Sequence, residues 1–104
     1  MANPWRGEVA LVVDGVRYSA KLTLGALVEL EAALDEPSLV ALVERFEGNR
    51  FSSRDVLALL GAGLRGGGAE VSERALARAD IEGGPMEAAR IAAELLARAF
   101  VVPE

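Results

Sequence analysis

Residues 7–23 read GEVALVVDGVRYSAKLT, and this stretch decides the fold class, because it predicts a β-hairpin in front of a chain with helical periodicity. Asp14-Gly15 at its centre favours a two-residue type I′ turn, in which both residues need positive φ. Since side chains alternate along a strand, closing the hairpin there gives one apolar face. That face consists of the pairs Val13–Val16, Leu11–Tyr18 and Val9–Ala20. An isolated hairpin is marginally stable in water, so we expect this face to pack on helices or on another chain.

Helical signals follow the hairpin closely, and capping residues mark where the helices begin. Thr23 is a candidate N-cap for the first helix, and Ser52 with Asp55 forms a capping box for the third. Pro37 and Pro85 suit the first turns of the second and last helices, where a missing N–H is harmless. The expected segments are 24–34, 37–47, a third that starts at Ser52, a weaker fourth over 72–80, and a last one over 85–100.

The sequence therefore predicts an α+β fold, with an N-terminal β-hairpin followed by a bundle of four to five short α-helices. We expect a single domain over 1–104, made of an N-terminal arm (1–6), the hairpin (7–23) and a helical part (24–100). Leucines of the first helix recur at helical spacing and are expected to pack under the sheet: Leu24, Leu27, Leu30 and Leu34. The third helix is expected to share one apolar face among Val56, Leu57, Leu60 and Leu64.

The composition excludes several kinds of chemistry. The chain has no cysteine and no histidine, which removes disulfides, thiol nucleophiles, Cys/His metal sites and imidazole catalysis. Carboxylates are the remaining candidates, and they cluster at Glu29, Glu31, Asp35 and Glu36 around the end of the first helix. Their spacing predicts no shared pocket, so we interpret them as a solvated acidic edge. We therefore expect neither an enzyme nor a bound cofactor.

The charge distribution argues against two classes of partner. The net charge is −5, and the basic residues are scattered, so the basic footprint of a nucleic-acid-binding protein is missing. No stretch is long and apolar enough to span a membrane, and the first ten residues have no apolar region typical of a secretory signal. We therefore expect the protein in the cytoplasm of the cell that makes it.

The glycine-rich stretch Gly61–Gly68, GAGLRGGG, matches the dinucleotide-binding pattern G-x-G-x-x-G literally. In a dinucleotide site these glycines follow a strand and open a helix. Here they follow the helical segment DVLALL and close it, so the context is reversed. We interpret them as a helix C-cap, a flexible connection and, at Gly63, a place where another backbone approaches. A nucleotide-binding module remains a remote alternative.

The last helix carries the clearest hypothesis about binding. Its charged residues form one narrow strip of alternating sign: Glu87, Arg90, Glu94 and Arg98. The remaining apolar arc spans about 220°, whereas a helix that covers a core needs about 100° or more. Either this helix is central, with neighbours on both flanks, or one flank meets a partner. On the second reading the partner flank is Ile91, Leu95 and Val102, and the core side holds Met86, Ala93, Leu96 and Phe100.

Three segments carry a resemblance to a known family. LTLGALVELEAAL, FSSRDVLALLGAGLRGGG and EGGPMEAARIAAELLARAF occur in this order after an Asp-Gly hairpin. Together they resemble the small tail proteins of bacterial gene transfer agents, phage-like particles that package host DNA. That family is grouped with phage tail-assembly chaperones, and some descriptions call it a tail tube protein.

The resemblance implies a tail-assembly chaperone, which binds the apolar, helical tape-measure protein during tail morphogenesis and needs no catalytic residue. The alternative that it leaves open is a structural tail tube protein of the particle, which would place the chain in the tail rather than only in the bacterial cytoplasm. Other tail proteins are the expected partners on both readings. A homo-oligomer that extends the sheet through the open edge of the hairpin is a further possibility.

Overall fold

The structure is a computed structural model that describes residues 7–34 and 39–99. Two antiparallel strands come first, β1 (Val9–Val13) and β2 (Val16–Ala20). Five helices follow among the described residues: α1 (Leu24–Leu34), α2 (Leu39–Glu47), α3 (Ser53–Gly66), α4 (Glu73–Arg78) and α5 (Gly84–Ala99). The predicted α+β fold with an N-terminal hairpin is confirmed. The N-terminal arm, Pro37 and Phe100 lie outside the described residues, and the single domain over 1–104 stays a prediction.

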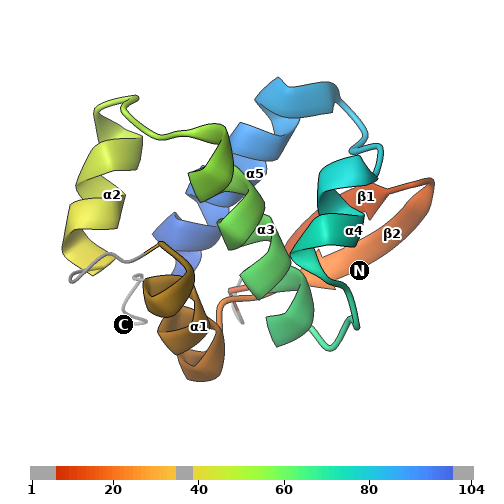
Figure 1. Cartoon of the computed structure of the whole chain (residues 1–104), viewed down its shortest axis with the longest axis horizontal. Coiled ribbons are helices and arrows are strands. Elements are labelled where there is room, and N and C mark those ends of the chain that lie inside the picture. Colours follow the sequence, from red (N-terminus) through yellow and green to blue (C-terminus); the bar gives the residue numbers. More distant parts are fainter. Residues whose placement is uncertain (1–6, 35–38, 100–104) are drawn as a thin grey trace.

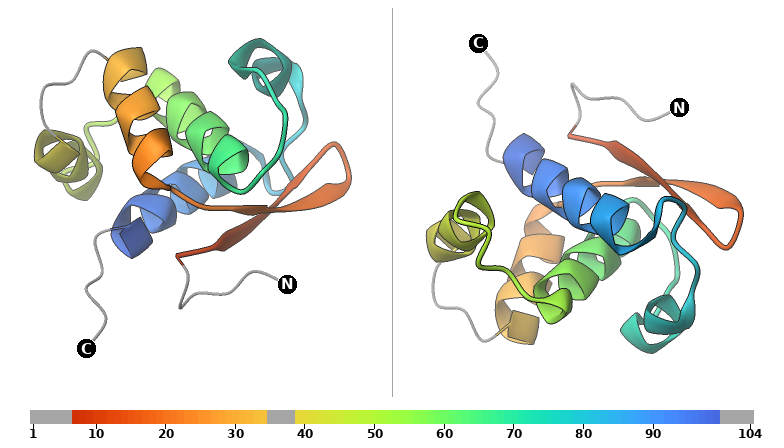
Figure 2. Two further views of the ribbon diagram at one scale, coloured as in Figure 1. Left: turned by 90° about the horizontal axis from the view of Figure 1, so that it is seen from below. Right: turned by 90° about the horizontal axis from the view of Figure 1, so that it is seen from above.

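The hairpin forms in the predicted register. Asp14 and Gly15 have φ angles of 52° and 79°, as a type I′ turn requires. The pairs run from Val13 opposite Val16 to Val9 opposite Ala20. In the predicted apolar face all three residues of β1 and Ala20 are buried and Tyr18 is half-buried, but Val16 is 52% exposed. Figure 2 shows the turn of the hairpin extending beyond the helices.

Replacing Gly15 with Val is expected to destabilise the fold by about 1–2 kcal/mol, the cost of a left-handed conformation for a residue with a Cβ. A Cβ built at Gly15 has no atom within 4 Å, so the effect comes from the backbone conformation alone. Thermal and urea unfolding measure it. Gly15→Asn is the control, because Asn tolerates positive φ. If the Val variant is as stable as the Asn variant, the turn is not the type described.

Helix α3 is the centre of the molecule. It packs against α1, α4, α5 and β2 (Figure 1), and α1 and α4 lie on opposite sides of it. Every residue from Ala58 to Leu64 is buried, and Leu59 is fully enclosed. In so small a protein a helix is buried to this extent only when other helices and strands pack on all of its sides. The predicted face is therefore only part of the buried surface of α3, and Val56 and Leu57 at its start are half-buried.

The predicted capping box starts α3. The hydroxyl of Ser52 accepts the N–H of Asp55 at 3.1 Å, and the Asp55 carboxylate accepts the N–H of Ser52 at 2.8 Å. The other oxygen of Asp55 accepts from the guanidinium of Arg45 at 2.8 Å. Asp55 is only 4% exposed, so a buried carboxylate with these partners ties α2 to the start of α3.

A second connection, which we call the glycine junction, joins the end of α3 to the end of β2 and to Lys21, which follows it. It consists of Gly63, Gly66 and Gly67 packed against residues 19–21. The N–H of Lys21 donates to the carbonyl of Gly63 at 2.8 Å. A Cβ on Gly66 or Gly67 would overlap a backbone carbonyl oxygen, that of Lys21 or Ser19 respectively. The close backbone approach expected at Gly63 therefore exists, and it extends over three glycines.

Helix α1 differs from the expectation in which side it buries. Ala26 and Leu30 face the core, whereas Leu24, expected under the sheet, is 79% exposed. The reason is the glycine junction, because the small side chain of Ala26 packs beside Gly66 and sets the rotation of α1. Leu24 then points away from the core, and Leu27 and Leu34 lie at its margin, where they are half-buried.

Candidate functional site

The predicted partner flank of α5 lies in the core. Ile91 is 2% exposed and Leu95 is fully enclosed. A Cβ built on Gly63 would lie 2.9 Å from Leu95 Cδ1, so this leucine packs directly on α3. Val102 lies outside the described residues. The structure therefore corrects the expected exposure of Ile91 and Leu95, while their role in binding a partner stays a prediction.

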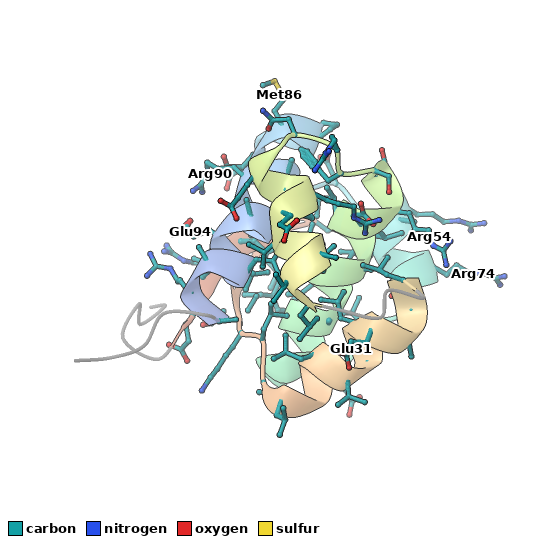
Figure 3. All side chains as sticks on the ribbon, turned by 90° about the vertical axis from the view of Figure 1, so that its left-hand side faces the viewer. Glu31, Arg54, Arg74, Met86, Arg90 and Glu94 are labelled. Atoms are coloured by element: carbon teal, nitrogen blue, oxygen red, sulfur yellow. The ribbon has the colours of Figure 1, made fainter. Side chains whose placement is uncertain are left out.

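The opposite flank of α5 is exposed where the core was expected. Met86 is 86% exposed, and Ala93 is also exposed, although Leu96 is buried as predicted. At 100° per residue, the buried side of α5 is centred between Ala88 and Leu95, and Met86 and Ala93 fall on the far side. Figure 3 shows Met86 at one end of the molecule, pointing outward.

The charged strip of α5 forms as predicted. The Arg90 guanidinium contacts Glu87 at 2.7 Å and Glu94 at 2.8 Å, and Arg98 contacts Glu94 at 2.8 Å. Hydrogen bonds from Arg90 lower the pKa of Glu87, and those from Arg98 and then Arg90 lower the pKa of Glu94. Both carboxylates therefore stay ionised at neutral pH, which suits a solvated strip and not proton transfer.

A groove lies between α3, α4 and the start of α5, and we call it the α3–α4–α5 groove. Its volume is about 490 Å³. Most of its lining is apolar, and the polar exceptions are Ser53 and Asp80. The apolar wall consists of Val56, Leu57, Leu60, Leu76, Ala77, Ala79, Ile81, Pro85 and Ala88. An open apolar groove of this kind is suited to the side chains of another protein.

A second apolar surface lies on α1 and was missed by the sequence analysis. Leu24 is 79% and Val28 60% exposed, and Ala32 one turn further on is exposed as well. These residues follow one another at i, i+4 and i+8, so they form one line on the side of α1 that faces away from the core. We call this line the α1 stripe. The sequence pattern that could have indicated the stripe is the spacing of Ala26 and Leu30, the buried residues of α1, on the opposite side of the helix.

The outer edge of β1 is partly closed. The N–H of Glu82 donates to the carbonyl of Val12 at 3.0 Å, and Asp14 donates its N–H to the carbonyl of Asp80 at 2.8 Å. Residues 80–82 therefore occupy the turn end of this edge, where a further strand would have to pair. Extension of the sheet by a second copy stays a prediction, and at Val12 it would have to displace this segment.

Glu29 of the acidic edge and the glycine-rich stretch have structural partners, whereas Asp35 and Glu36 lie outside the described residues. Glu29 pairs with Arg65, which also lies 3.7 Å from Glu73 and so links α1, α3 and α4. Within residues 7–34 and 39–99, no group of three or more acidic residues is arranged to hold a metal ion. Gly61–Gly66 forms the end of α3, and Gly66 and Gly67 contact the chain's own backbone. None of the described helices is long and apolar enough to cross a membrane.

A comparison with protein families matches residues 6–101 to the family described as "Phage tail tube protein, GTA-gp10". The match covers the hairpin and all the described helices. No curated protein and no solved structure matches the chain.

Proposed function

The chain belongs to the GTA-gp10 family of phage tail tube proteins, and from this premise we propose that it is a structural subunit of a phage-like tail, present there in many copies. The observation that carries the proposal is the family match over residues 6–101. The description of the family names a part of the tail and no reaction, in keeping with a protein that acts by binding.

Two features of the surface support a role in assembly. A tube subunit contacts at least two neighbours, and the protein exposes two separate apolar surfaces, the α3–α4–α5 groove and the α1 stripe. The α1 stripe consists of exposed side chains on one helix, and the groove is lined by buried, half-buried and exposed side chains of three helices and of residues 79–81 between α4 and α5. Contiguous apolar surface of this kind is typical of proteins that bind other proteins.

A second candidate function is that of a tail-assembly chaperone for the tape-measure protein. The α3–α4–α5 groove favours this candidate, because its apolar walls are suited to an amphipathic helix laid along it. A chaperone acts in the cytoplasm of the producing bacterium and leaves before the tail is complete, whereas a tube subunit stays in the particle tail. The two candidates therefore differ in where the protein ends up.

Quantitative mass spectrometry of purified mature particles distinguishes the two candidates. We expect the protein in the particles in many copies for each copy of a protein that occurs once per tail. Lysate from the same producing cells is the control for expression. A protein that is abundant in the lysate and absent from the particles would contradict the tube role and support the chaperone. Recovery with the tape-measure protein from that lysate would support the chaperone further.

A further inference from the structure

We propose that the α1 stripe of one copy docks into the α3–α4–α5 groove of the next copy, so that the subunits associate head to tail. The inference rests on the proposed function in one respect, since a tube subunit must bind its own copies. It goes further by naming the two surfaces that meet. They are the α1 stripe of Leu24, Val28 and Ala32, and the groove of about 490 Å³.

The shapes of the two surfaces are complementary. The α1 stripe is a straight line of aliphatic side chains on a helix, with neighbours one turn apart. The groove is lined by residues of α3, of α4 with the connection that follows it, and of the start of α5. A helix that places i and i+4 side chains in an apolar groove is a recurrent mode of protein recognition.

Charges of opposite sign lie on α4 and α1, the helices that contribute to the two surfaces, while the groove lining itself includes the acidic Asp80. On α4, whose Leu76 and Ala77 line the groove, Arg74 and Arg78 are exposed, and on α1 Glu31 flanks the stripe. None of these three side chains has an ion pair with the part of the chain that the structure describes. Figure 3 shows Arg54 and Arg74 extending on the same side of the molecule, while Glu31 projects from α1. This pattern favours contact between α1 and α4 of different copies, because opposite charges steer and orient association.

The positions of the two surfaces allow a chain of copies. Helices α1 and α4 lie on opposite sides of α3 (Figures 1 and 2), so one molecule cannot bring its own stripe into its own groove. A contact between two different surfaces is heterologous, and it produces a ring or a filament instead of a closed pair. Each added copy offers a free groove and a free stripe, as a growing tube needs.

Two single substitutions block one surface each. Val28→Glu places a carboxylate in the stripe, and Ala77→Glu places one at the α4 wall of the groove. Both positions are exposed, so neither change buries a charge in the subunit. Val40→Glu is the matched control, because Val40 is 63% exposed on α2, away from both surfaces. Thermal unfolding should give all three variants the stability of the wild type.

Sedimentation velocity then measures association as the protein concentration rises. We expect the wild type and Val40→Glu to form species larger than dimers, and each of the other two variants to associate at least about tenfold more weakly. An equimolar mixture of Val28→Glu and Ala77→Glu should form a dimer and nothing larger. In that dimer the intact stripe of one variant occupies the intact groove of the other, and both remaining surfaces are blocked.

Three results would overturn the inference. A wild type that stays monomeric at about 1 mM does not use this contact. Loss of association in Val28→Glu but not in Ala77→Glu would mean that the stripe pairs with itself. Equal loss in Val40→Glu would mean a general effect of charge. These results are separate from the proposed function: a monomer that is abundant in particles refutes only the head-to-tail contact, and an associating protein that is absent from particles refutes only the tube role.

Discussion

Leu95→Glu is expected to unfold the protein or to lower its free energy of unfolding by at least about 4 kcal/mol. Leu95 is fully enclosed between α5 and α3, against Gly63. A carboxylate at this position would lose its hydration and gain no cation or hydrogen-bond donor in return. Single domains are stabilised by only about 5–15 kcal/mol, so the loss is a large part of the total. Urea unfolding followed by circular dichroism measures it.

Two further variants serve as controls for Leu95→Glu. Ala93→Glu puts the same side chain on the exposed side of the same helix and is expected to leave stability within about 0.5 kcal/mol of the wild type. Leu95→Ala removes the packing without adding a charge and should cost about 2–5 kcal/mol. A Leu95→Glu variant that unfolds like Ala93→Glu would place Leu95 at the surface, as the partner-flank hypothesis first held.

Gly66→Ala is expected to destabilise the protein by about 3 kcal/mol, although alanine is the better helix former. A Cβ at Gly66 would overlap the carbonyl oxygen of Lys21, which is backbone and cannot rotate away. Either the segment between β2 and α1 moves, or α3 loses its contact with Ala26. Differential scanning calorimetry measures the change, and two-dimensional NMR should show the largest shifts at residues 19–21.

The matched control is Gly25→Ala, the same substitution in α1. A Cβ at Gly25 would meet only the Thr23 hydroxyl oxygen, at 3.9 Å, which is ordinary contact. Its backbone is helical, so the change should stabilise the protein by about 0.5–1 kcal/mol. Equal effects at Gly25 and Gly66 would show that helix propensity, and not the glycine junction, decides the outcome.

The features that the sequence predicted best depend on neighbours in the chain. The turn at Asp14-Gly15, the register of the hairpin and the capping box of Ser52 with Asp55 all form as expected. Each is a short-range pattern in which the residue types require one backbone conformation. The start of each described helix likewise lies within two residues of the predicted one, except for the second, where residues 35–38 are not described.

The features that the sequence did not predict depend on how the helices pack. Periodicity marks a broad apolar arc on α5, but it does not say which part of the arc faces α3. Leu95 is buried because Gly63 lets α5 approach closely, and Leu24 is exposed because Ala26 packs beside Gly66. In both cases a glycine on α3 decides the rotation of a helix far away in the sequence. Both contacts join helices that are far apart in the sequence, so the α1 stripe and the groove were not visible before the helices were placed.

The packing of α5 against α3 and β1 has a consequence for the order in which the newly made chain can fold. Ribosomes release a protein from its N-terminus, and α5 is made after every other described element. Until it emerges, the sides of α3 and β1 that it covers stay open, and Leu95 is not there to fill the space beside Gly63. The hairpin and the first four helices can form earlier, but together they lack a closed core. The core around α3 can therefore close only after α5 has been made, because α5 covers the remaining sides of α3 and β1.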